Sequence, residues 1–388
     1  MMDTTKWVQL SEIAALITKG TTPTTIGFDF QDTGINFLKI ECFSEDGAFI
    51  EKKVAHISEG CHEKLKRSQL EEGDILFSIA GAIGRVAVVM KEMLPANTNQ
   101  ALAIIRIRRK DVYLPYIKLI LTSPIVKTQF ERKKQGVAQL NISLKDINEL
   151  EIPLLTINKQ IEYASLFDKV SRIIVARKQQ LQKLDELIKS RFVEMFIGKN
   201  YSRRTVDEVS LGKGEYGAQS ASVEYTSDRP RYVRITDIND DGTLNNDMVS
   251  SINHSDDDQY RLRYGDFLFA RMGATVGKTY AFREGNQIYA GYLIRYKLDL
   301  TQIHPLYLFW YTRLNEYWDW VKLNQSGAAQ PGINAKKFGS LRIPVPPIDI
   351  QNRFAAFVAE VDKSKLAVKQ SLEKLETLKK SLMQQYFG

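Results

Sequence analysis

The chain has 388 residues and a formal net charge of +8, with 44% hydrophobic and 26% charged residues. This composition excludes a disordered or fibrous protein and leaves room for two globular domains with their own cores. No stretch approaches the roughly 18 apolar residues of a membrane span. The first residues lack the apolar run of a signal peptide, and Cys42 and Cys61 are too few for a disulfide framework. We therefore expect a cytoplasmic protein without a membrane partner.

The first part of the chain alternates apolar and polar residues in short runs bounded by Gly, Asn and Asp, a pattern typical of β-strands. We expect these strands at residues 37–40, 75–79, 85–89 and 101–107. An apolar stretch that begins with a proline, residues 115–121, predicts a helix. The Ile-Pro pair at residues 152–153 should end this structure, because the residue before a proline disfavours helix. Residues 1–157 are therefore predicted to form a mixed α+β domain.

Residues 158–197 form a long segment without Gly or Pro, in which apolar residues recur at alternating spacings of four and three. Such a heptad pattern predicts a helix with one apolar seam. At 1.5 Å per residue, about 39 residues would extend roughly 58 Å. The seam positions are Phe167, Val170, Ile174, Leu181, Leu184 and Ile188.

Residues 198–388 repeat the same order of features, which indicates a domain duplication. The motif Gly-Asp-Ile-Leu-Phe at residues 73–77 returns as Gly-Asp-Phe-Leu-Phe at residues 265–269, and Gln160 returns as Gln351. We also align Lys19-Gly20 with Lys213-Gly214. A second proline-initiated helix is expected at residues 305–314, in a second domain over residues 198–348. A second long helix is expected at residues 349–388, with its seam at Val358, Val361, Val368, Leu372, Leu375 and Leu382.

The two seams differ in their polar positions. Lys365 stands where the first seam has Ile174, and Arg177 stands where the second has Val368. Seams that differ in this way favour pairing with each other over homodimerisation. We therefore predict an α+β fold of two homologous domains, each followed by a long helix. The helices should pair as an antiparallel coiled coil with pseudo-twofold symmetry, which would place the domains at opposite ends.

The excess of Lys and Arg is spread over both halves, which suits two domains that each face a polyanion such as DNA. Lys39 and Arg234 end matching strands, and Arg85 and Lys278 follow matching glycines. They could contact phosphates or could be solvated strand ends, and the sequence leaves both interpretations open. Lys19 and Lys213 are further candidate DNA contacts.

Two loops combine glycine with amide side chains, and Gln and Asn can bond to adenine in the major groove. Because the loops occur in both copies, a shared backbone or phosphate contact, or a simple turn, is an equal alternative. The glutamines are Gln135 and Gln139 in the first copy, and Gln325 and Gln330 in the second.

Residues that recognise bases should differ between copies that bind different sequences. Arg271 replaces Ile79 and is a candidate for guanine recognition by the second domain alone. Other candidates in the first copy are Thr21, Thr22, Thr24, Asn97, Thr98, Asn99 and Gln100. Those in the second copy are Tyr216, Gln219, Ser220, Gln287 and Tyr289.

Catalytic and metal-binding patterns do not emerge from the sequence. The segment from Gly273 to Thr279 is one residue short of a phosphate-binding loop, and we expect a tight turn there. Cys42, Cys61 and the histidines near them fit no zinc spacing. Neither an Asn/Asp-Pro-Pro-aromatic motif nor a Gly-rich adenosylmethionine loop is present. We therefore expect no catalytic residue and no metal.

The order of these features resembles the specificity subunits of Type I restriction–modification systems. The resemblance rests on the two Gly-Asp motifs, on the Leu-Glu-Ile-Pro and Leu-Arg-Ile-Pro segments, and on Gln160 and Gln351 leading into the long helices. It implies that each domain is a target-recognition domain for one half of a split double-stranded DNA target, and that the helices set the gap. It also implies docking of two methyltransferase subunits that use S-adenosylmethionine, with or without restriction subunits. A coiled-coil scaffold and a stand-alone methyltransferase or nuclease are the alternatives.

Overall fold

The computed structural model describes residues 6–45, 47–133, 142–252, 258–327 and 331–388. The chain divides into two compact units. Unit 1 comprises Met1–Lys178 with Gln370–Gly388, and unit 2 comprises Gln179–Lys369. The long helices α6 (Ile157–Phe196) and α10 (Ile348–Phe387) each contribute to both units. Each unit therefore contains one globular part and segments of both long helices.

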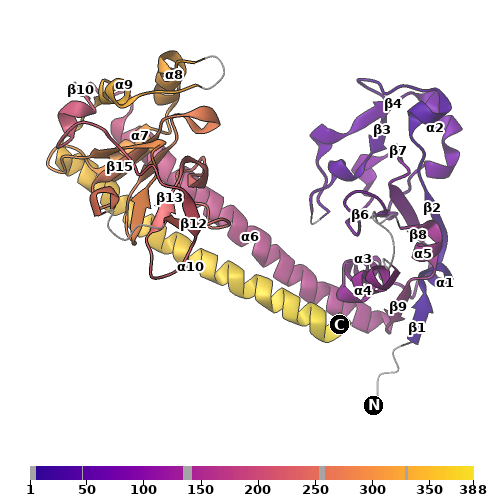
Figure 1. Cartoon of the computed structure of the whole chain (residues 1–388). Coiled ribbons are helices and arrows are strands. Elements are labelled where there is room, and N and C mark those ends of the chain that lie inside the picture. The colour runs from indigo at the N-terminus through magenta and orange to yellow at the C-terminus, as the bar shows by residue number, and fades with distance from the viewer. Residues whose placement is uncertain (1–5, 46, 134–141, 253–257, 328–330) are drawn as a thin grey trace. The chain divides into compact units, whose positions relative to one another are not determined.

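The globular part of unit 1 is built on a four-stranded antiparallel sheet with the order β2-β8-β5-β6 (Figure 1). A three-stranded sheet, β4-β3-β7, and a two-stranded sheet, β1-β9, complete it. The strands are β1 Lys6–Gln9, β2 Ala14–Lys19, β3 Ile35–Leu38, β4 Ala55–Ile57, β5 Ile75–Ser78, β6 Val86–Val88, β7 Ala96–Thr98, β8 Leu102–Ile107 and β9 Glu151–Leu154. The helices are α1 Leu10–Ile13, α2 Glu59–Lys64, α3 Leu114–Leu121, α4 Pro124–Lys133 and α5 Leu144–Asn148.

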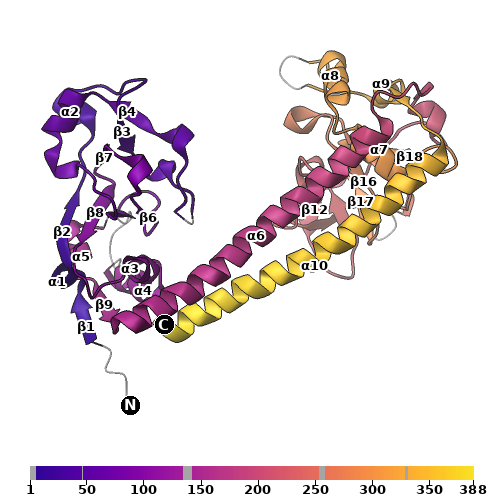
Figure 2. The same cartoon turned by 180° about the vertical axis from the view of Figure 1, so that it is seen from behind.

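Unit 2 repeats this plan with a four-stranded sheet in the order β11-β18-β15-β16, which confirms the predicted α+β duplication. Strands β16 and β18 of this sheet are labelled in Figure 2. The strands are β10 Arg203–Thr205, β11 Glu215–Tyr216, β12 Ser222–Glu224, β13 Arg231–Val233, β14 Ser250–Ile252, β15 Asp266–Ala270, β16 Thr279–Ala281, β17 Gln287–Tyr289, β18 Leu293–Lys297 and β19 Arg342–Pro344. The helices are α7 Pro305–Tyr311, α8 Asn315–Asn324 and α9 Ala335–Gly339. Helix α7 is shorter than predicted, and its C-cap residue Thr312 donates its hydroxyl to the Phe309 carbonyl.

Strands β5 and β15, which we call the central strands of the two main sheets, are each buried on both faces. In unit 1, Phe77 of β5 packs in the core that includes α3, whereas Leu76 packs on the opposite face with Leu38. In unit 2, Phe269 and Leu268 of β15 divide in the same way. Side chains alternate between the faces of a strand, so the continuous apolar run of the Gly-Asp motif fits a strand covered on both sides.

The Ile-Pro segments form strands, which the sequence did not predict. Pro153 of β9 lies opposite Trp7 of β1, and Pro344 of β19 lies opposite Arg203 of β10. Each pair is an isolated two-stranded sheet, where a proline does not interrupt a neighbouring ladder. The start of each globular part is thereby joined to the segment that leads into a long helix.

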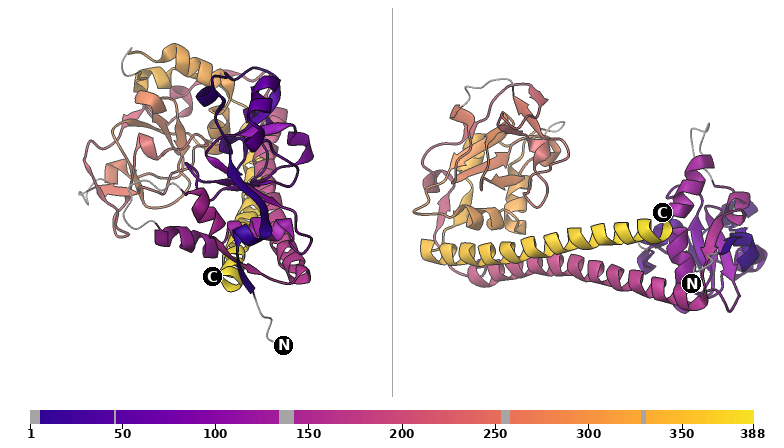
Figure 3. Two further views of the ribbon diagram at one scale, coloured as in Figure 1. Left: turned by 90° about the vertical axis from the view of Figure 1, so that its right-hand side faces the viewer. Right: turned by 90° about the horizontal axis from the view of Figure 1, so that it is seen from below.

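Within each unit, parts of α6 and α10 lie side by side (Figure 3). In unit 1 the start of α6 meets the end of α10, with the rings of Tyr163 and Tyr386 4.4 Å apart. In unit 2 the end of α6 meets the start of α10, with Phe192 and Phe354 5.3 Å apart. The helices therefore pair in antiparallel fashion, as predicted. All the predicted seam residues are buried or half-buried.

One polar seam position has a partner on the other helix. The Lys365 ammonium lies 2.5 Å from a carboxylate oxygen of Asp185. This lysine interrupts the apolar seam of α10, and its charge is compensated by α6 rather than left against apolar side chains. The contact supports the inference that the two seams are complementary.

An aromatic cluster joins the end of a long helix to each globular part. In unit 1, Phe387 packs 6.1 Å from the ring of Tyr116, whose hydroxyl donates to the Pro153 carbonyl. In unit 2, Phe196 packs 4.9 Å from Tyr307, whose hydroxyl donates to Pro344. The helix that follows one globular part thus ends in the core of the other unit.

The repeated glutamines fasten the start of each long helix. The Gln160 amide is fully buried, accepts from the Tyr113 N–H at 2.8 Å and donates to the carbonyls of Asp111 and Leu155. Gln351 makes the equivalent three bonds in unit 2, at His304, Gln302 and Pro346. A buried amide with all these bonds satisfied fixes the helix to the segment before α3 or α7.

Among the described residues, none of the helices is both long enough and apolar enough to cross a membrane.

Candidate nucleic-acid interface

Arg271 and Ile79 occupy the same place in the two units. The Arg271 N–H donates to the Tyr292 carbonyl at 3.1 Å, and the Ile79 N–H donates to the Ala101 carbonyl at 2.9 Å. Both residues directly follow the central strand of the main sheet. The sequence alignment of these two positions therefore agrees with the backbone hydrogen bonds.

The first strand of each main sheet aligns differently from our prediction. Lys19 lies opposite Ala103 of β8, and Tyr216 lies opposite Ile294 of β18, which is the matching position. Tyr216 is therefore the structural counterpart of Lys19. Lys213 lies outside the strand, with its ammonium 2.5 Å from Asp207.

The glycine after this position confirms the corrected alignment. A Cβ atom added to Gly20 would lie 1.9 Å from the Thr98 carbonyl oxygen, and one added to Gly217 would lie 2.3 Å from the Tyr289 carbonyl oxygen. Both glycines are required by the same close approach of the backbone. Gly20 therefore matches Gly217, and the predicted match with Gly214 is wrong.

In unit 2 this region carries an arginine between two tyrosines. The Arg271 guanidinium lies 4.7 Å from the ring centroid of Tyr216 and 5.8 Å from that of Tyr292. The two tyrosines are 42% and 54% exposed. The Tyr216 hydroxyl accepts from the Ala335 N–H at 3.2 Å, which fixes the ring. The contact between Arg271 and Tyr216 brings together two of the predicted candidates.

Two amide side chains belong to the same region. Gln219 is exposed, and its Cγ would lie 3.1 Å from a Cβ added to Gly291, the neighbour of Tyr292. Gln325 is exposed and precedes Ser326, which is bridged to Gly332, and Gly332 is in turn bridged to Met272. We call Tyr216, Gln219, Arg271, Tyr292 and Gln325 the unit 2 patch. Gln135, Gln139 and Gln330 lie outside the described residues.

The matching positions of unit 1 carry different side chains. Lys19 is exposed, and the Thr22 hydroxyl donates to the side-chain carbonyl of Gln100. The Asn99 side chain accepts from the Ala101 N–H at 3.2 Å. The half-buried Thr21 donates its N–H to the Thr98 carbonyl, as Ala218 does to that of Tyr289. The two units thus present unlike polar groups on equivalent backbones.

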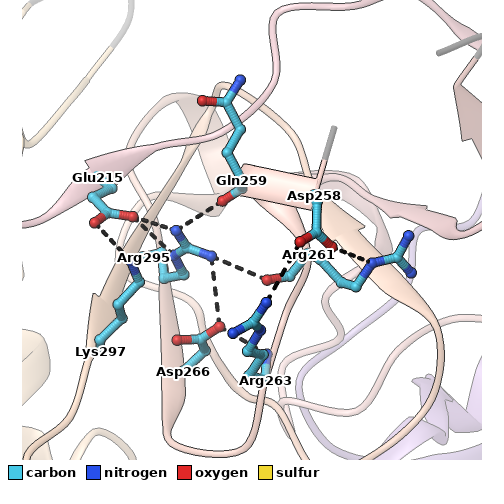
Figure 4. Close-up of polar contacts among 8 residues, drawn as sticks. All are labelled: Glu215, Asp258, Gln259, Arg261, Arg263, Asp266, Arg295 and Lys297. Carbon is cyan, nitrogen blue, oxygen red and sulfur yellow. Dashed lines mark hydrogen bonds and ion pairs between the residues drawn. The ribbon is translucent and has the colours of Figure 1, made fainter. Parts of the chain in front are cut away.

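A buried arginine fastens the two-residue strand β11, which carries Tyr216. Arg295 of β18 is 5% exposed and donates to the Glu215 carboxylate and to the carbonyls of Gln259 and Arg261 (Figure 4). Its Nη1 lies 3.7 Å from Asp266, the buried aspartate of the Gly-Asp motif. Burial raises the pKa of Asp266, and nearby cations counteract only part of this effect.

The corresponding aspartate of unit 1 is paired from another position. Asp74 receives two hydrogen bonds of 2.7 Å from Arg106, which also donates to the Gln69 carbonyl. Arg106 occupies the position of Lys297, so the cation has moved by two residues along the same strand face. Both units therefore have a buried aspartate at this position, but the arginine that pairs with it comes from a different position in each unit.

The repeated cations make structural contacts. Arg85 donates to the Phe43 carbonyl at 3.2 Å, and Lys278 donates to the matching Ile238 carbonyl at 3.3 Å. These bonds tie the turn after the central strand to the segment after β3 or β13. Phosphate contact by these two residues stays a prediction, now alongside a structural role.

The second repeated pair is also engaged within its own unit. Arg234 donates to the buried carboxylate of Asp237 and to the Met248 carbonyl, both at 2.9 Å. Lys39 lies 4.5 Å from the ring centroid of Phe30. Neither side chain is a simple solvated strand end.

Three predicted base-recognition residues, Asn97, Thr98 and Tyr289, are fully buried, and an exposed role is wrong for them. The Asn97 amide donates to the Leu65 carbonyl and the Ser68 hydroxyl, and it lies 2.5 Å from His62. The Tyr289 ring lies inside the core beneath the Arg295 guanidinium, 4.9 Å away. The buried Thr98 donates its hydroxyl to a backbone carbonyl, and Gln287 accepts from a tyrosine hydroxyl.

The remaining motifs are placed as turns and core. Gly273 and Gly277 have φ of +70° and +88° in the turn between β15 and β16, as predicted. Cys42 and Cys61 belong to different hydrophobic clusters, and burial raises the pKa of both thiols. Within the described ranges, no group of three or more His, Cys, Asp or Glu side chains could hold a metal ion.

Comparison with known proteins finds one family along most of the chain. Residues 2–186 and 218–378 match the family model described as Type I restriction modification DNA specificity domain. The EcoBI specificity subunit of a type I restriction enzyme from Escherichia coli is 27% identical over 209 residues, which cover 52% of this chain and 43% of that protein. The chain thus spans less than half the length of this relative.

Two further comparisons extend over nearly the whole chain. A protein assigned as the MjaX type I restriction enzyme specificity subunit of Methanocaldococcus jannaschii is 22% identical over 381 residues, covering 90% of this chain and 85% of that one. A solved structure titled for complex assembly and conformational transition of the type I R-M system aligns with a TM-score of 0.62. It is 17% identical and covers 98% of this chain and 96% of its own. It supports the fold.

Proposed function

We propose, because this chain belongs to the family of Type I restriction–modification DNA specificity proteins, that its two units each recognise one half of a bipartite, non-palindromic DNA target. The chain is a specificity subunit of such a system. The two halves of the target would be separated by a gap of fixed length.

The observation that carries the proposal is the difference between the two units at equivalent positions. Lys19, Ile79 and Ala101 of unit 1 are replaced by Tyr216, Arg271 and Tyr292 in unit 2, on backbones held by matching hydrogen bonds. Contacts to phosphates position a protein on DNA, whereas differing side chains at base edges give sequence preference. Two unlike surfaces on one fold are therefore suited to two unlike half-sites.

The helix pair is proposed to set the gap between half-sites and to bind two methyltransferase subunits. Several apolar side chains on α6 and α10 are turned away from the seam and are more than two-fifths exposed, among them Ile173, Leu187 and Leu378. Exposed apolar residues on a paired helix are suited to packing against helices of another protein. A coiled-coil scaffold unrelated to DNA would use the same helices but gives no reason for two duplicated and diverged globular parts.

Catalysis is proposed to reside in the partners, which would bind S-adenosylmethionine, with or without restriction subunits in the assembly. We expect the purified chain, given S-adenosylmethionine and DNA, to transfer no methyl groups. Together with its methyltransferase subunit it should methylate one split motif, identified by sequencing modified bases in a host with and without the gene. Methylation by the chain alone would contradict this assignment, and so would an unsplit motif.

We also expect the affinity of the assembled complex for DNA to fall steeply with salt. If six to ten phosphates are contacted, the binding constant should drop by about 10³–10⁵-fold between 50 and 200 mM salt, because condensed counterions are released. Fluorescence anisotropy with a labelled duplex would measure the slope, with the methyltransferase alone as the control. A flat response would favour the scaffold.

A further inference from the structure

We propose that Arg271, whose guanidinium lies over the rings of Tyr216 and Tyr292, recognises a guanine in the half-site bound by unit 2. The proposal rests on the proposed function and specifies its chemistry at one position. The ligand is the major-groove edge of guanine, whose O6 and N7 are both acceptors.

The Arg271 side chain is positioned without being neutralised. Its guanidinium lies over the rings of Tyr216 and Tyr292, at 4.7 and 5.8 Å. Its Nε is buried and meets no hydrogen-bond partner among the residues that the structure describes. Aromatic faces attract a guanidinium and limit its rotamers, but they do not occupy its N–H donors.

Other arginines of unit 2 show what an internal role looks like. The Arg295 guanidinium is bonded to a carboxylate and two carbonyls, and Arg313 donates to two threonine hydroxyls and to the Phe309 carbonyl. All three nitrogens of Arg295 and both terminal nitrogens of Arg313 are thus hydrogen-bonded within the protein, although the Nε of Arg313, like that of Arg271, meets no partner among the described residues. Arg271 differs because, within the described part of the chain, its guanidinium makes only the two ring contacts. It therefore has donors left for an acceptor outside the protein.

The surroundings of Arg271 are accessible to such an acceptor. The rings of Tyr216 and Tyr292 are about half exposed, and Gln219 and Gln325 are exposed beside them. A planar fork of N–H donors between two rings matches the paired O6 and N7 acceptors, which a lysine ammonium cannot do in the same way.

Comparison with unit 1 favours base recognition by Arg271 over phosphate binding. A contact that only positions the protein on the DNA backbone would be useful in both units. Yet Ile79, the counterpart of Arg271, is buried, and Ala101 offers no ring. The arginine and its tyrosines occur in one unit only. This is expected of a group that recognises a base present in one half-site and not in the other.

The experiment compares variants of the full chain, each assembled with its methyltransferase subunit, by selection from a library of randomised duplexes. We expect Arg271→Ala to lose the preference for guanine at one position of one half-site, by roughly ten- to a hundredfold. All other positions should keep their preference. Arg271→Lys should behave like Arg271→Ala, because it retains charge but not the fork. Tyr292→Ala should weaken the same position to a smaller extent.

Arg263→Ala is the matched control. It removes an exposed arginine of the same unit, paired with Asp258 at 3.5 Å, and should leave the motif unchanged. An unchanged motif in Arg271→Ala would overturn the inference while the proposed function stands. A uniform loss of affinity for all sequences in Arg271→Ala, largely restored in Arg271→Lys, would also overturn it, in favour of a phosphate contact. Failure of the wild-type complex to select any motif would instead contradict the proposed function. Circular dichroism melts would establish that each variant is folded.

Discussion

Replacing Phe387 with alanine is expected to destabilise unit 1 by about 3–5 kcal/mol, the usual loss when a large aromatic side chain is removed from a core. Phe387 is 1% exposed and packs against Tyr116, Tyr163 and Phe167, with ring centroids 5.9–6.3 Å apart. It lies near the end of α10, more than 180 residues from the last of these partners in the sequence. The substitution should therefore release the end of α10 from unit 1 rather than disturb a local turn.

Hydrogen–deuterium exchange followed by mass spectrometry would measure the effect. In Phe387→Ala, peptides of α3, β9 and the start of α6 should exchange faster, while those of α7 and β19 should not. Phe196→Ala, at the matching position, should give the opposite result, because Phe196 packs against Tyr307 and Phe354 in unit 2. Leu378→Ala is the control, since Leu378 is on the same helix but 47% exposed. Equal protection of both units in all three variants would show that the aromatic clusters do not stabilise their units separately.

The long helices could be predicted because heptad spacing is a local and redundant signal. The bounds Ile157–Phe196 and Ile348–Phe387 are set by many apolar positions that agree with one another. The ends of the helices carry the same signal but have a further role that spacing cannot reveal. Nothing in the heptad pattern indicates that Phe196 and Phe387 enter the cores of the globular parts.

The Ile-Pro strands show where a local rule misleads. Because the residue before a proline disfavours helix, the Ile-Pro pair predicted only the end of the preceding structure and not a strand. In the structure, Pro153 and Pro344 lie in strands that each pair with only one neighbouring strand. The N–H group that a proline lacks is therefore not needed for a second ladder of hydrogen bonds. The partner strands lie some 140 residues away in the sequence, beyond the reach of local patterns.

The candidate site was predicted in part. Comparison of the copies identified Arg271 because its alignment with Ile79 was correct, and it identified Tyr216 as a differing residue although the alignment of that strand was wrong by three residues. It did not identify Tyr292, since its counterpart Ala101 was assigned to a predicted strand, whereas β8 begins at Leu102. Asn97 and Tyr289 were chosen for their polarity, but their burial is decided by side chains that are distant in the sequence, such as Arg295.

Replacing Arg295 with methionine is expected to destabilise unit 2 by about 3–5 kcal/mol, because one partner of a buried ion pair is removed and the other remains. Asp266 would be left buried with a single backbone donor, the Arg263 N–H at 2.8 Å. Glu215 would keep only Lys297, at 2.9 Å, and strand β11 would lose one of its side-chain contacts with β18 while keeping its backbone pairing. Urea denaturation at pH 7 would measure the change, and Arg263→Met, which breaks only an exposed pair, should cost less than about 0.5 kcal/mol.

The difference between wild type and Arg295→Met should narrow as the pH falls from 7 towards 4. Burial already raises the pKa of Asp266 above its ordinary value, and loss of the Arg295 charge should raise it further. The folded variant then binds a proton more readily than the unfolded chain, so acid stabilises it. Glu215 acts in the same direction. Burial alone would raise its pKa, but hydrogen bonds from Arg295 and Lys297 lower it in the wild type. The stability that ionised Glu215 contributes to the wild type is therefore lost on acidification. In the variant Glu215 has no bond from Arg295, so this contribution is smaller and its loss lowers the stability less. A difference that stays constant or widens between pH 7 and 4 would mean that Arg295 acts through packing on Tyr289 rather than through charge.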